Sequence, residues 1–478
     1  MAFPAPLLRR LAAFLVPLFV AAGVHAALPA GVTQGPSIEG VTEYRLGNGL
    51  TVLLFPDASK PTTTVNVTYQ VGSMHENYGE TGMAHLLEHL LFKGTPSSGN
   101  LMTELGKRGM QFNGSTNTDR TNYFQSFTAN PQSLDWALSM EADRMVNSYI
   151  RRSDLDTEMT VVRNEFESGE NNPQLVLLGK MLASSYQWHN YAHLPIGARS
   201  DIENVNIERL QAFYRTYYQP DNAVLIVAGK FDVDTTLAAI AKYFGPIPKP
   251  ARKLPTIYTV DPVQDGERAV TLRRAGNSKF LGLMFHTVRG AHPDYVATDV
   301  LGDVLTVEPA GRLYKSLVET KKASSVESWG EAQHDPGSLT LFAQIPDGDD
   351  IAPARDAMFA TLEDLKKNPV TDVEVERIKV RAAKYFDEVM SNPQRFAVAI
   401  SGAIALGDWR LFFLQRDRYR TVTAADAQRV ALQYFKRSNV TIGEFIPDAA
   451  PDRAPVPATV DIAAMVKDYK GDATATLG

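Results

Sequence analysis

The chain has 478 residues, of which 44% are hydrophobic and 21% charged, proportions typical of a globular protein with more than one domain. Its formal net charge of -6 gives no reason to expect nucleic acid or an anionic membrane surface as a partner. There is no cysteine, which excludes disulfides, thiolate metal sites and a cysteine nucleophile. We therefore expect a protein that is stabilised by packing alone.

The first residues have the pattern of a secretory signal peptide. Arg9 and Arg10 precede an apolar run from Leu11 to Val24, and the small residue Ala26 follows. The apolar run is too short to span a bilayer as a helix. We expect residues 1–26 to be removed, which would leave a periplasmic or extracellular protein without a stable membrane anchor.

Strand and helix patterns alternate through the first half of the chain. Asn48-Gly49 is a turn signal between two strand-like runs and predicts a hairpin. Further strands are predicted at 62–71 and 123–127, with a polar turn region at 112–119 before the second of them. Helices are predicted at 82–92, 133–148 and 154–168. This alternation indicates α/β or α+β layers.

The sequence repeats itself at a constant offset of 217 residues. The segment from Val205 to Asn222, with the strand-like run 223–228, matches Val422 to Asn439 and the run 440–445. A proline-rich segment separates the two copies. We predict a signal peptide at 1–26, an N-terminal domain at 27–245, a linker at 246–262, a homologous C-terminal domain at 263–450 and a C-terminal tail at 451–478.

The helix predicted at 82–92 contains the order His85-x-x-Glu88-His89. Two histidines four residues apart project from the same face of a helix, at the spacing that lets both bind one metal ion. A carboxylate on that side reaches a water activated by the metal, and the order is the inverted form of a common zinc motif. The alternative is that the three residues fell together by chance on an amphipathic helix. The corresponding stretch of the second half, near 295–303, contains no histidine.

A catalytic zinc site needs a third protein ligand, and the helix predicted at 154–168 offers carboxylates. Here the sequence resembles the pitrilysin-like, or inverzincin, zinc metallopeptidases, which include the mitochondrial processing peptidases and bacterial two-subunit members. That family pairs His-x-x-Glu-His with a downstream Glu-x6-Glu, and Glu158 and Glu165 have this spacing. The resemblance covers nearly the whole mature chain, with further family blocks at 48–50, 94–95, 141–145 and 407–410.

The resemblance implies a fold and a set of site residues. The implied fold is α+β, with two homologous domains that each contain a mostly antiparallel sheet with helices packed on one side, together forming half of a clamshell. His85, His89 and Glu165 are implied to bind Zn²⁺, with Glu88 as the general base that deprotonates a zinc-activated water. Glu158 is implied to orient a ligand and to add negative charge near the metal. The alternative for Glu158 is a solvated acid in the first turn of its helix.

The region from Asn113 to Tyr123 is implied to lie beside the cleft. A peptide substrate adds there as an extended strand, so backbone hydrogen bonds supply much of the affinity. We predict Asn113, Ser115 and Thr116 as substrate-binding residues.

Other histidines have less support as metal ligands. His189 and His193 are also four residues apart, but their segment has no helical pattern and runs into Pro195, which favours a structural role in a loop. For His75, upstream of the metal helix, a surface role is favoured over one in the cleft.

In one respect the sequence departs from the family. Self-sufficient members have an Arg-x6-Tyr pair in the C-terminal half, which contacts substrate and helps stabilise the transition state. Those positions fall here on Val318 and Ser325, so both residues of the pair are missing. The chain is also half as long as the four-domain single-chain members. Either the activity is weak, or a homologous partner subunit supplies the pair.

These observations predict a secreted zinc metalloendopeptidase that hydrolyses peptides or unfolded segments. We expect it to be the zinc-bearing subunit of a heterodimer rather than of a homodimer. One alternative is an inactive or weakly active peptide-binding scaffold subunit, although a scaffold has no need of the intact motif residues. Another is a protein that binds or senses metal without turnover.

Overall fold

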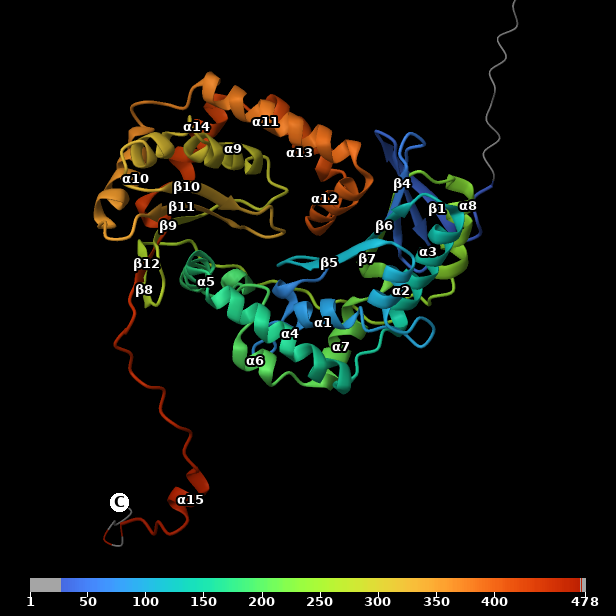
Figure 1. Ribbon diagram of the computed structural model, residues 1–478, viewed down its shortest axis with the longest axis horizontal. Coiled ribbons are helices and arrows are strands. Elements are labelled where there is room, and N and C mark those ends of the chain that lie inside the picture. Colours follow the sequence, from blue (N-terminus) through green and yellow to red (C-terminus); the bar gives the residue numbers. More distant parts are fainter. Residues whose placement is uncertain (1–26, 473, 475–478) are drawn as a thin grey trace, which may run out of the picture.

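The computed structural model describes residues 27–472 and residue 474. The predicted signal peptide, residues 1–26, lies outside the described residues. Within the described part of the chain, no helix combines the length and the apolar character needed to cross a membrane. Two sheets with their helices form an arc, and a C-terminal tail leaves one end of it (Figure 1).

The N-terminal half contains a seven-stranded sheet with the order β1-β2-β3-β7-β4-β6-β5. All neighbouring strands are antiparallel except β3 and β7, which are parallel. The strands are β1 (Val32–Ile38), β2 (Val41–Leu46), β3 (Thr51–Pro56), β4 (Thr62–Tyr69), β5 (Gln111–Thr116), β6 (Thr121–Thr128) and β7 (Ala223–Gly229). The helices are α1 (Met83–Leu90), α2 (Leu101–Lys107), α3 (Pro131–Asn147), α4 (Arg152–Glu170), α5 (Pro173–Ser185), α6 (Arg199–Glu203), α7 (Ile207–Tyr217) and α8 (Val233–Phe244).

The C-terminal half contains a five-stranded sheet with the order β10-β11-β9-β12-β8, in which only β12 and β8 are parallel. The strands are β8 (Arg268–Arg274), β9 (Lys279–His286), β10 (Ser325–Gly330), β11 (Ser338–Ile345) and β12 (Val440–Pro447). The helices are α9 (Tyr295–Thr306), α10 (Ala352–Asp364), α11 (Asp372–Ser391), α12 (Pro393–Ala405), α13 (Leu411–Thr421), α14 (Ala424–Tyr434) and, in the tail, α15 (Ile462–Val466).

The internal repeat is present in the structure. α7 and α14 begin 217 residues apart, and so do β7 and β12. Both strands lie inside their sheets, parallel to one neighbour and antiparallel to the other. The turn before each strand is also shared, because the Asn222 side chain donates to the Tyr217 carbonyl at 2.9 Å and the Asn439 side chain donates to the Tyr434 carbonyl at 2.8 Å. The two halves are therefore built on one plan.

The halves exchange helices at their interface. α5 of the N-terminal half packs on the C-terminal sheet, where Met181 is buried against Phe445. α12 of the C-terminal half packs on the N-terminal sheet, where Phe396 is buried near Leu53 and Ile226. The predicted α+β class with mostly antiparallel sheets is confirmed. Helices are expected on one side of each sheet, and the structure adds a helix from the opposite half on the other side. One face of each sheet is covered by helices of its own half, and the other by a helix from the opposite half.

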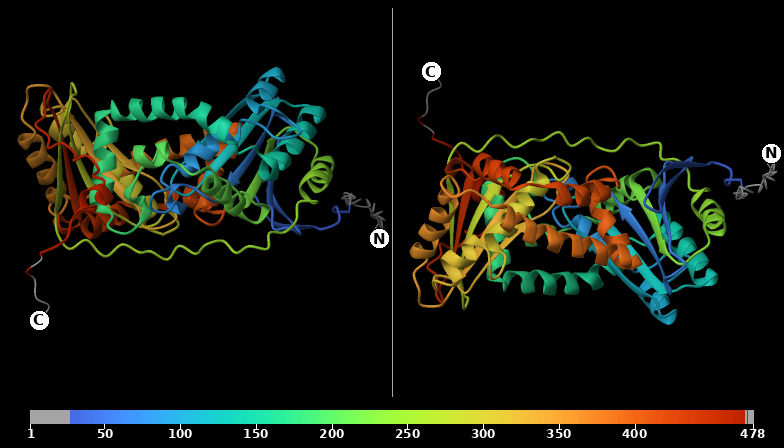
Figure 2. Two further views of the ribbon diagram at one scale, coloured as in Figure 1. Left: turned by 90° about the horizontal axis from the view of Figure 1, so that it is seen from below. Right: turned by 90° about the horizontal axis from the view of Figure 1, so that it is seen from above.

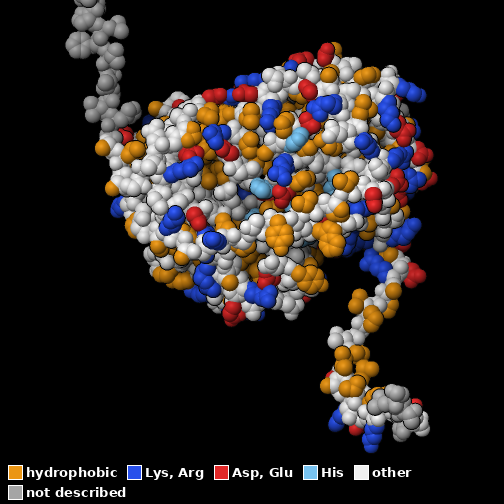
Figure 3. All heavy atoms as spheres, turned by 180° about the vertical axis from the view of Figure 1, so that it is seen from behind, with side chains coloured by type: hydrophobic (Ala, Val, Ile, Leu, Met, Phe, Trp, Pro, Cys, Tyr) orange, Lys and Arg blue, Asp and Glu red, His pale blue; other side chains and the backbone are white. Residues whose placement is uncertain are grey.

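An extended segment connects the halves. α8 ends at Phe244 and β8 begins at Arg268, and the predicted linker 246–262 contains neither helix nor strand. It runs along one side of the molecule from one half to the other (Figure 2). Near its end, the Asp261 carboxylate accepts the backbone N–H groups of residues 187–189, each at 2.8 Å. Seen from behind, the surface intermixes acidic and basic side chains (Figure 3), in keeping with the modest net charge of -6.

One segment predicted as a turn is a strand. The polar turn region expected at 112–119 is β5 up to Thr116, and the turn itself is confined to residues 117–120. β5 is an edge strand that pairs only with β6 among the described strands. Its polar side chains lack the hydrophobic alternation by which a strand is recognised in sequence.

Candidate metal centre

Helix α1 presents the His-x-x-Glu-His residues on one face. Its apolar residues form the buried face: Met83, Ala84, Leu86, Leu87 and Leu90. The helix begins after Gly82, whose φ of 92° is left-handed. A Cβ at this position would lie 2.8 Å from the Ile196 carbonyl oxygen, so both the backbone conformation and the space require glycine. Packing of the apolar face thus leaves the two histidines directed at α4.

Three donor atoms from α1 and α4 meet at one point. His85 Nε2 lies 3.3 Å from His89 Nε2 and 3.6 Å from Glu165 Oε2, and His89 Nε2 lies 3.4 Å from Glu165 Oε2. Three ligands at about 2.1 Å from a tetrahedral zinc ion are about 3.4 Å apart, so this triangle has the size that zinc requires. Two imidazole nitrogens and one carboxylate oxygen are also a donor set of catalytic zinc sites. The residues therefore fit zinc.

The surroundings of the two imidazoles favour metal binding. His89 Nδ1 lies 3.0 Å from Glu158 Oε1, and a carboxylate at Nδ1 keeps the proton there and leaves the Nε2 lone pair free. Burial, with a further contribution from His89, lowers the pKa of His85 to about 4. His85 is therefore neutral at neutral pH, the form that binds a metal ion.

Glu158 is a buried member of the site. Its second oxygen forms an ion pair with Lys93. Burial by itself would raise the pKa of Glu158, but hydrogen bonds from Lys93 and His89 lower it. The carboxylate is therefore ionised and held in place, which excludes the alternative of a solvated first-turn acid.

Glu88 lies against the backbone of β5. Thr116 Oγ1 donates a hydrogen bond to Glu88 Oε2 at 2.7 Å, and a Cβ on Gly114 would lie 3.0 Å from Glu88 Cγ. Burial raises the pKa of Glu88, and the hydrogen bond from Thr116 acts in the opposite direction. A partly desolvated carboxylate fixed between a metal triad and the edge of a sheet has the position required of a general base.

A cavity of about 460 Å³ is lined by two of the three donor residues, His85 and Glu165, and by residues of both halves. The first half contributes His85 and Glu165, among others, and the second half contributes Trp329 and Glu331 from the end of β10 and the loop after it. A ligand that fills this cavity therefore contacts both halves of the chain.

The three residues predicted to bind substrate all lie on β5 but differ in their contacts. Thr116 lines the cavity and contacts Glu88. Asn113 is exposed on the same strand. The Ser115 side chain donates to Asn122 Oδ1 at 2.7 Å and accepts from Arg120 at 2.9 Å, so it is directed at β6 and away from the cavity.

Sequence reasoning missed two charged residues that hold α1 in place. Lys93, just after the helix, pairs with Glu158. Glu76, before the helix, accepts the backbone N–H groups of Gly82 and Ala84 at 2.9 and 2.8 Å and so caps its N-terminus. Burial raises the pKa of Glu76 to about 8 despite these hydrogen bonds. The sequence signal that could have indicated both residues is a charged side chain on each side of the apolar helix.

His75 and His189 have structural contacts away from the three donor atoms. His75 packs on Tyr217 with 5.3 Å between ring centroids, and burial lowers its pKa to about 4, so the expected surface role is wrong. His189 and His193 lie in a loop, as predicted, and His189 Nε2 lies 3.1 Å from Asp335 Oδ2.

The arginine and the tyrosine nearest to the expected positions of the Arg/Tyr pair are held by other groups. Val318 lies in a π-helical turn and Ser325 begins β10. Arg312 is occupied by the Glu374 carboxylate, at 2.7 and 2.8 Å, and by two backbone carbonyl oxygens. The Tyr314 hydroxyl donates to a glutamate six residues earlier, at 3.3 Å.

The chain is similar to proteins of one known family. Residues 51–197 match the family described as Insulinase (Peptidase family M16), and residues 204–381 match the Peptidase M16 inactive domain. The zinc protease PqqE of Helicobacter pylori is 29% identical over 413 residues, which cover 85% of this chain and 92% of that protein.

A solved structure of a protease from Helicobacter pylori has a TM-score of 0.80 at 27% identity and covers 85% of this chain and 99% of that chain. The mitochondrial-processing peptidase subunit beta of Caenorhabditis elegans is 30% identical over 187 residues, 38% of this chain and 40% of that protein. The two family matches together span more than half of the chain. The chain therefore belongs to peptidase family M16, the insulinase or pitrilysin-like family.

Proposed function

We propose that this chain is a secreted zinc-dependent endopeptidase and the catalytic subunit of a heterodimer. The observation that carries the proposal is the triangle of donor atoms from His85, His89 and Glu165 beside the Glu88 carboxylate. Relatives named as zinc proteases support both the metal and peptide hydrolysis. Secretion rests on the sequence of residues 1–26.

The residues of the site divide the work of hydrolysis. A zinc ion held by the triad would supply Lewis acidity and lower the pKa of a water molecule. Glu88, fixed by Thr116, takes a proton from the attacking water and delivers it to the nitrogen of the leaving amine. Glu158 keeps the proton of His89 on Nδ1 and so preserves the orientation of that ring.

The free edge of β5 supports an extended peptide as substrate. β5 pairs with β6 on one side, and its other edge has no partner among the described strands. A peptide that adds to this edge passes the Glu88 side chain, because Gly114 and Thr116 lie against it. Backbone hydrogen bonds of this kind suit peptides and unfolded segments, whose backbone is available.

The proposed partner is a homologous subunit that contributes an arginine and a tyrosine. Val318 has no polar group to offer, and Arg312 is committed to Glu374. A relative that is named as the beta subunit of a peptidase supports the pairing. The alternative, an inactive peptide-binding scaffold, is less favoured because the donor atoms and the Glu88 carboxylate are in place.

The test compares the mature chain with its Glu88→Gln variant, each alone and mixed with a homologous subunit that has the Arg/Tyr pair. Zinc is measured by mass spectrometry and cleavage with a quenched fluorescent peptide library. We expect about one zinc per chain in both proteins, and cleavage only by the wild type, increased by the partner. Zinc without cleavage in every combination contradicts the peptidase function. Activity of the lone chain that survives dilution contradicts the obligate heterodimer.

A further inference from the structure

The turn between β5 and β6, residues 117–120, is held by hydrogen bonds from segments outside its own sheet. The Asp119 carboxylate is buried at this turn. Its Oδ1 accepts a hydrogen bond from the Tyr191 hydroxyl at 2.7 Å, and its Oδ2 accepts one from the backbone N–H of His334 at 3.0 Å. Tyr191 lies in the loop after α5, and His334 lies in the loop between β10 and β11. The C-terminal half therefore reaches the N-terminal sheet at this carboxylate.

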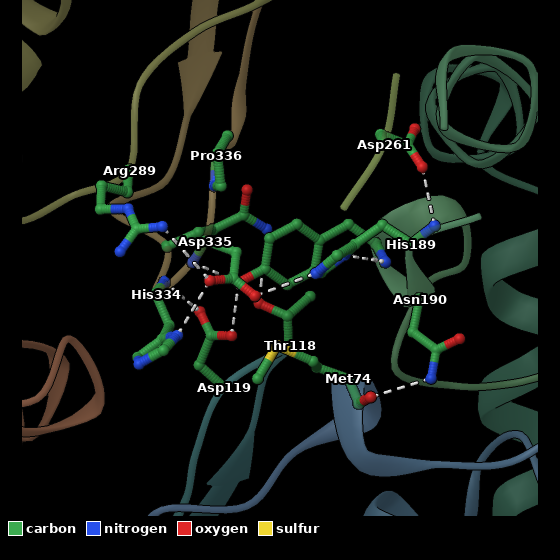
Figure 4. Close-up of polar contacts among 12 residues, drawn as sticks. Met74, Thr118, Asp119, His189, Asn190, Asp261, Arg289, His334, Asp335 and Pro336 are labelled. Atoms are coloured by element: carbon green, nitrogen blue, oxygen red, sulfur yellow. Dashed lines mark hydrogen bonds and ion pairs between the residues drawn. The ribbon is translucent and has the colours of Figure 1, made fainter. Parts of the chain in front are cut away.

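A second carboxylate, Asp335, extends the contact. The backbone N–H of Asp335 donates to the Tyr191 hydroxyl at 3.1 Å, so this one hydroxyl joins the two acids. The Asp335 carboxylate lies 3.1 Å from His189 Nε2 and 3.2 Å from His334 Nδ1. Figure 4 shows His189, His334 and the two acids converging from separate segments of the chain. We call Asp119, Tyr191, His189, His334 and Asp335 the inter-half latch.

The end of β5 connects the inter-half latch to Glu88. Thr116, the last residue of β5, donates to the Glu88 carboxylate. Asn117 follows, and its side chain accepts the backbone N–H groups of Asp119 and Arg120 at 2.9 and 2.8 Å. β5 has β6 as its only partner strand among the described residues, and the turn after it is also held by the backbone N–H groups of residues 73 and 74, which donate to the carbonyls of residues 117 and 118 at 3.1 and 2.9 Å. A shift of the turn is transmitted directly to Thr116.

We propose that Asp119 and Tyr191 are positioning residues through which the C-terminal half sets the place of the Glu88 carboxylate. The inference rests on the proposed function, in which Glu88 is the general base. Without the Tyr191 hydroxyl, Asp119 Oδ1 is a buried acceptor that has lost its donor, although Oδ2 keeps the backbone N–H of His334, and a shift of the turn relieves this loss. Misplacement of a catalytic group by about 1 Å lowers turnover on the order of a hundredfold. The free edge of β5 still pairs with substrate, so kcat falls more than KM rises.

The test uses two tyrosines with different partners. Tyr191→Phe removes only the hydroxyl that holds Asp119. Tyr214→Phe is the matched control, because Tyr214 is also buried and its hydroxyl donates to the Arg144 carbonyl at 2.8 Å and accepts the backbone N–H of Ser148 at 3.1 Å. Each variant is measured for kcat and KM in the form that cleaves a quenched peptide, for bound zinc, and for amide hydrogen exchange of residues 113–121.

We expect Tyr191→Phe to lower kcat about ten- to a hundredfold at similar KM, to speed exchange at 113–121 and to retain zinc. Tyr214→Phe should match the wild type. Asp119→Asn keeps the shape of the side chain and should repeat the Tyr191→Phe result, which guards against misfolding of a single variant. Unchanged kcat and exchange in both latch variants, or an equal loss in Tyr214→Phe, overturns the proposal. If the wild type cleaves no peptide, the proposed function fails, and the exchange data alone decide whether the inter-half latch holds β5.

Discussion

The two halves of the chain share a framework and differ in their side chains at one helix. Both have the helix, asparagine turn and central strand that recur after 217 residues, and each lends one helix to the other's sheet. α1 in the first half presents His85 and His89, whereas α9, which follows the corresponding strand of the second half, presents Asp299 and Asp303. Asp299 accepts a hydrogen bond from Tyr419 at 2.5 Å, and burial raises its pKa to about 6. Both halves thus have the elements that the packing requires, and the side chains on α1 distinguish the half that contains the candidate metal centre.

The largest expected effect comes from removing a metal ligand. His89→Ala and Glu165→Ala should abolish zinc binding and lower peptide cleavage by more than about a thousandfold, because the metal supplies several kcal/mol of transition-state stabilisation. Asp303→Asn on α9 is the matched control and should retain zinc and activity. Zinc content by mass spectrometry and cleavage rates give the answer, and loss of zinc from the control would contradict a site confined to the first half.

The next effect tests whether the halves depend on each other. Met181 on α5 and Ile400 on α12 are fully buried at the exchanged helices. Met181→Ala and Ile400→Ala should each lower the free energy of unfolding by about 2–5 kcal/mol, through lost contacts and a residual cavity. Urea denaturation should show one transition for the whole chain, since neither sheet is covered without the other half. Val161→Ala, on the exposed face of α4, should change little, and two separate wild-type transitions would contradict this interdependence.

A smaller effect is expected from the carboxylate behind the metal ligands. Glu158→Gln should weaken zinc binding by about 10- to 100-fold, because His89 loses the charge that fixes its tautomer and ring orientation. The exposed Glu167 on the same helix provides the control, Glu167→Gln, which should bind zinc as the wild type does. Competition with a zinc indicator measures both affinities. Equal affinities in the two variants would mean that His89 keeps its orientation without Glu158.

The smallest effect is a dependence of stability on pH that belongs to the second half. Burial would raise the pKa of Glu374, but hydrogen bonds from Arg312 and Thr371 lower it to about 2. An acid whose pKa is lowered by folding stabilises the protein above its ordinary pKa of 4.5, and this contribution is lost as the pH falls from there toward 2. Glu374→Gln should therefore show a flatter decline of the thermal midpoint over this range than the exposed-site control Glu376→Gln, with zinc binding unchanged at neutral pH.

The parts of the structure that were predictable from sequence are those with a strong local pattern. Asn48-Gly49 predicted its hairpin by turn chemistry, and the helical spacing of apolar residues predicted α1. The approach of Glu165 to the histidines followed from the family spacing, since nothing local in the two helices shows that they meet. The sequence predicts a turn where β5 lies, because this edge strand is polar and its pairing with β6 is not a local property. The contact of Tyr191 with Asp119 joins two loops and has no sequence pattern.

The exchange of α5 and α12 has consequences for proteolysis of the chain and for its folding during synthesis. The linker 246–262 is mostly exposed, so a protease would cut it readily, yet the two fragments would remain one particle because each covers a sheet of the other. During synthesis, the same exchange determines when the N-terminal sheet can be completed. The N-terminal sheet, whose last strand ends at Gly229, stays uncovered on one face until residues 393–405 have left the ribosome. The domain that contains the metal centre is thus finished by one of the last helices to be made.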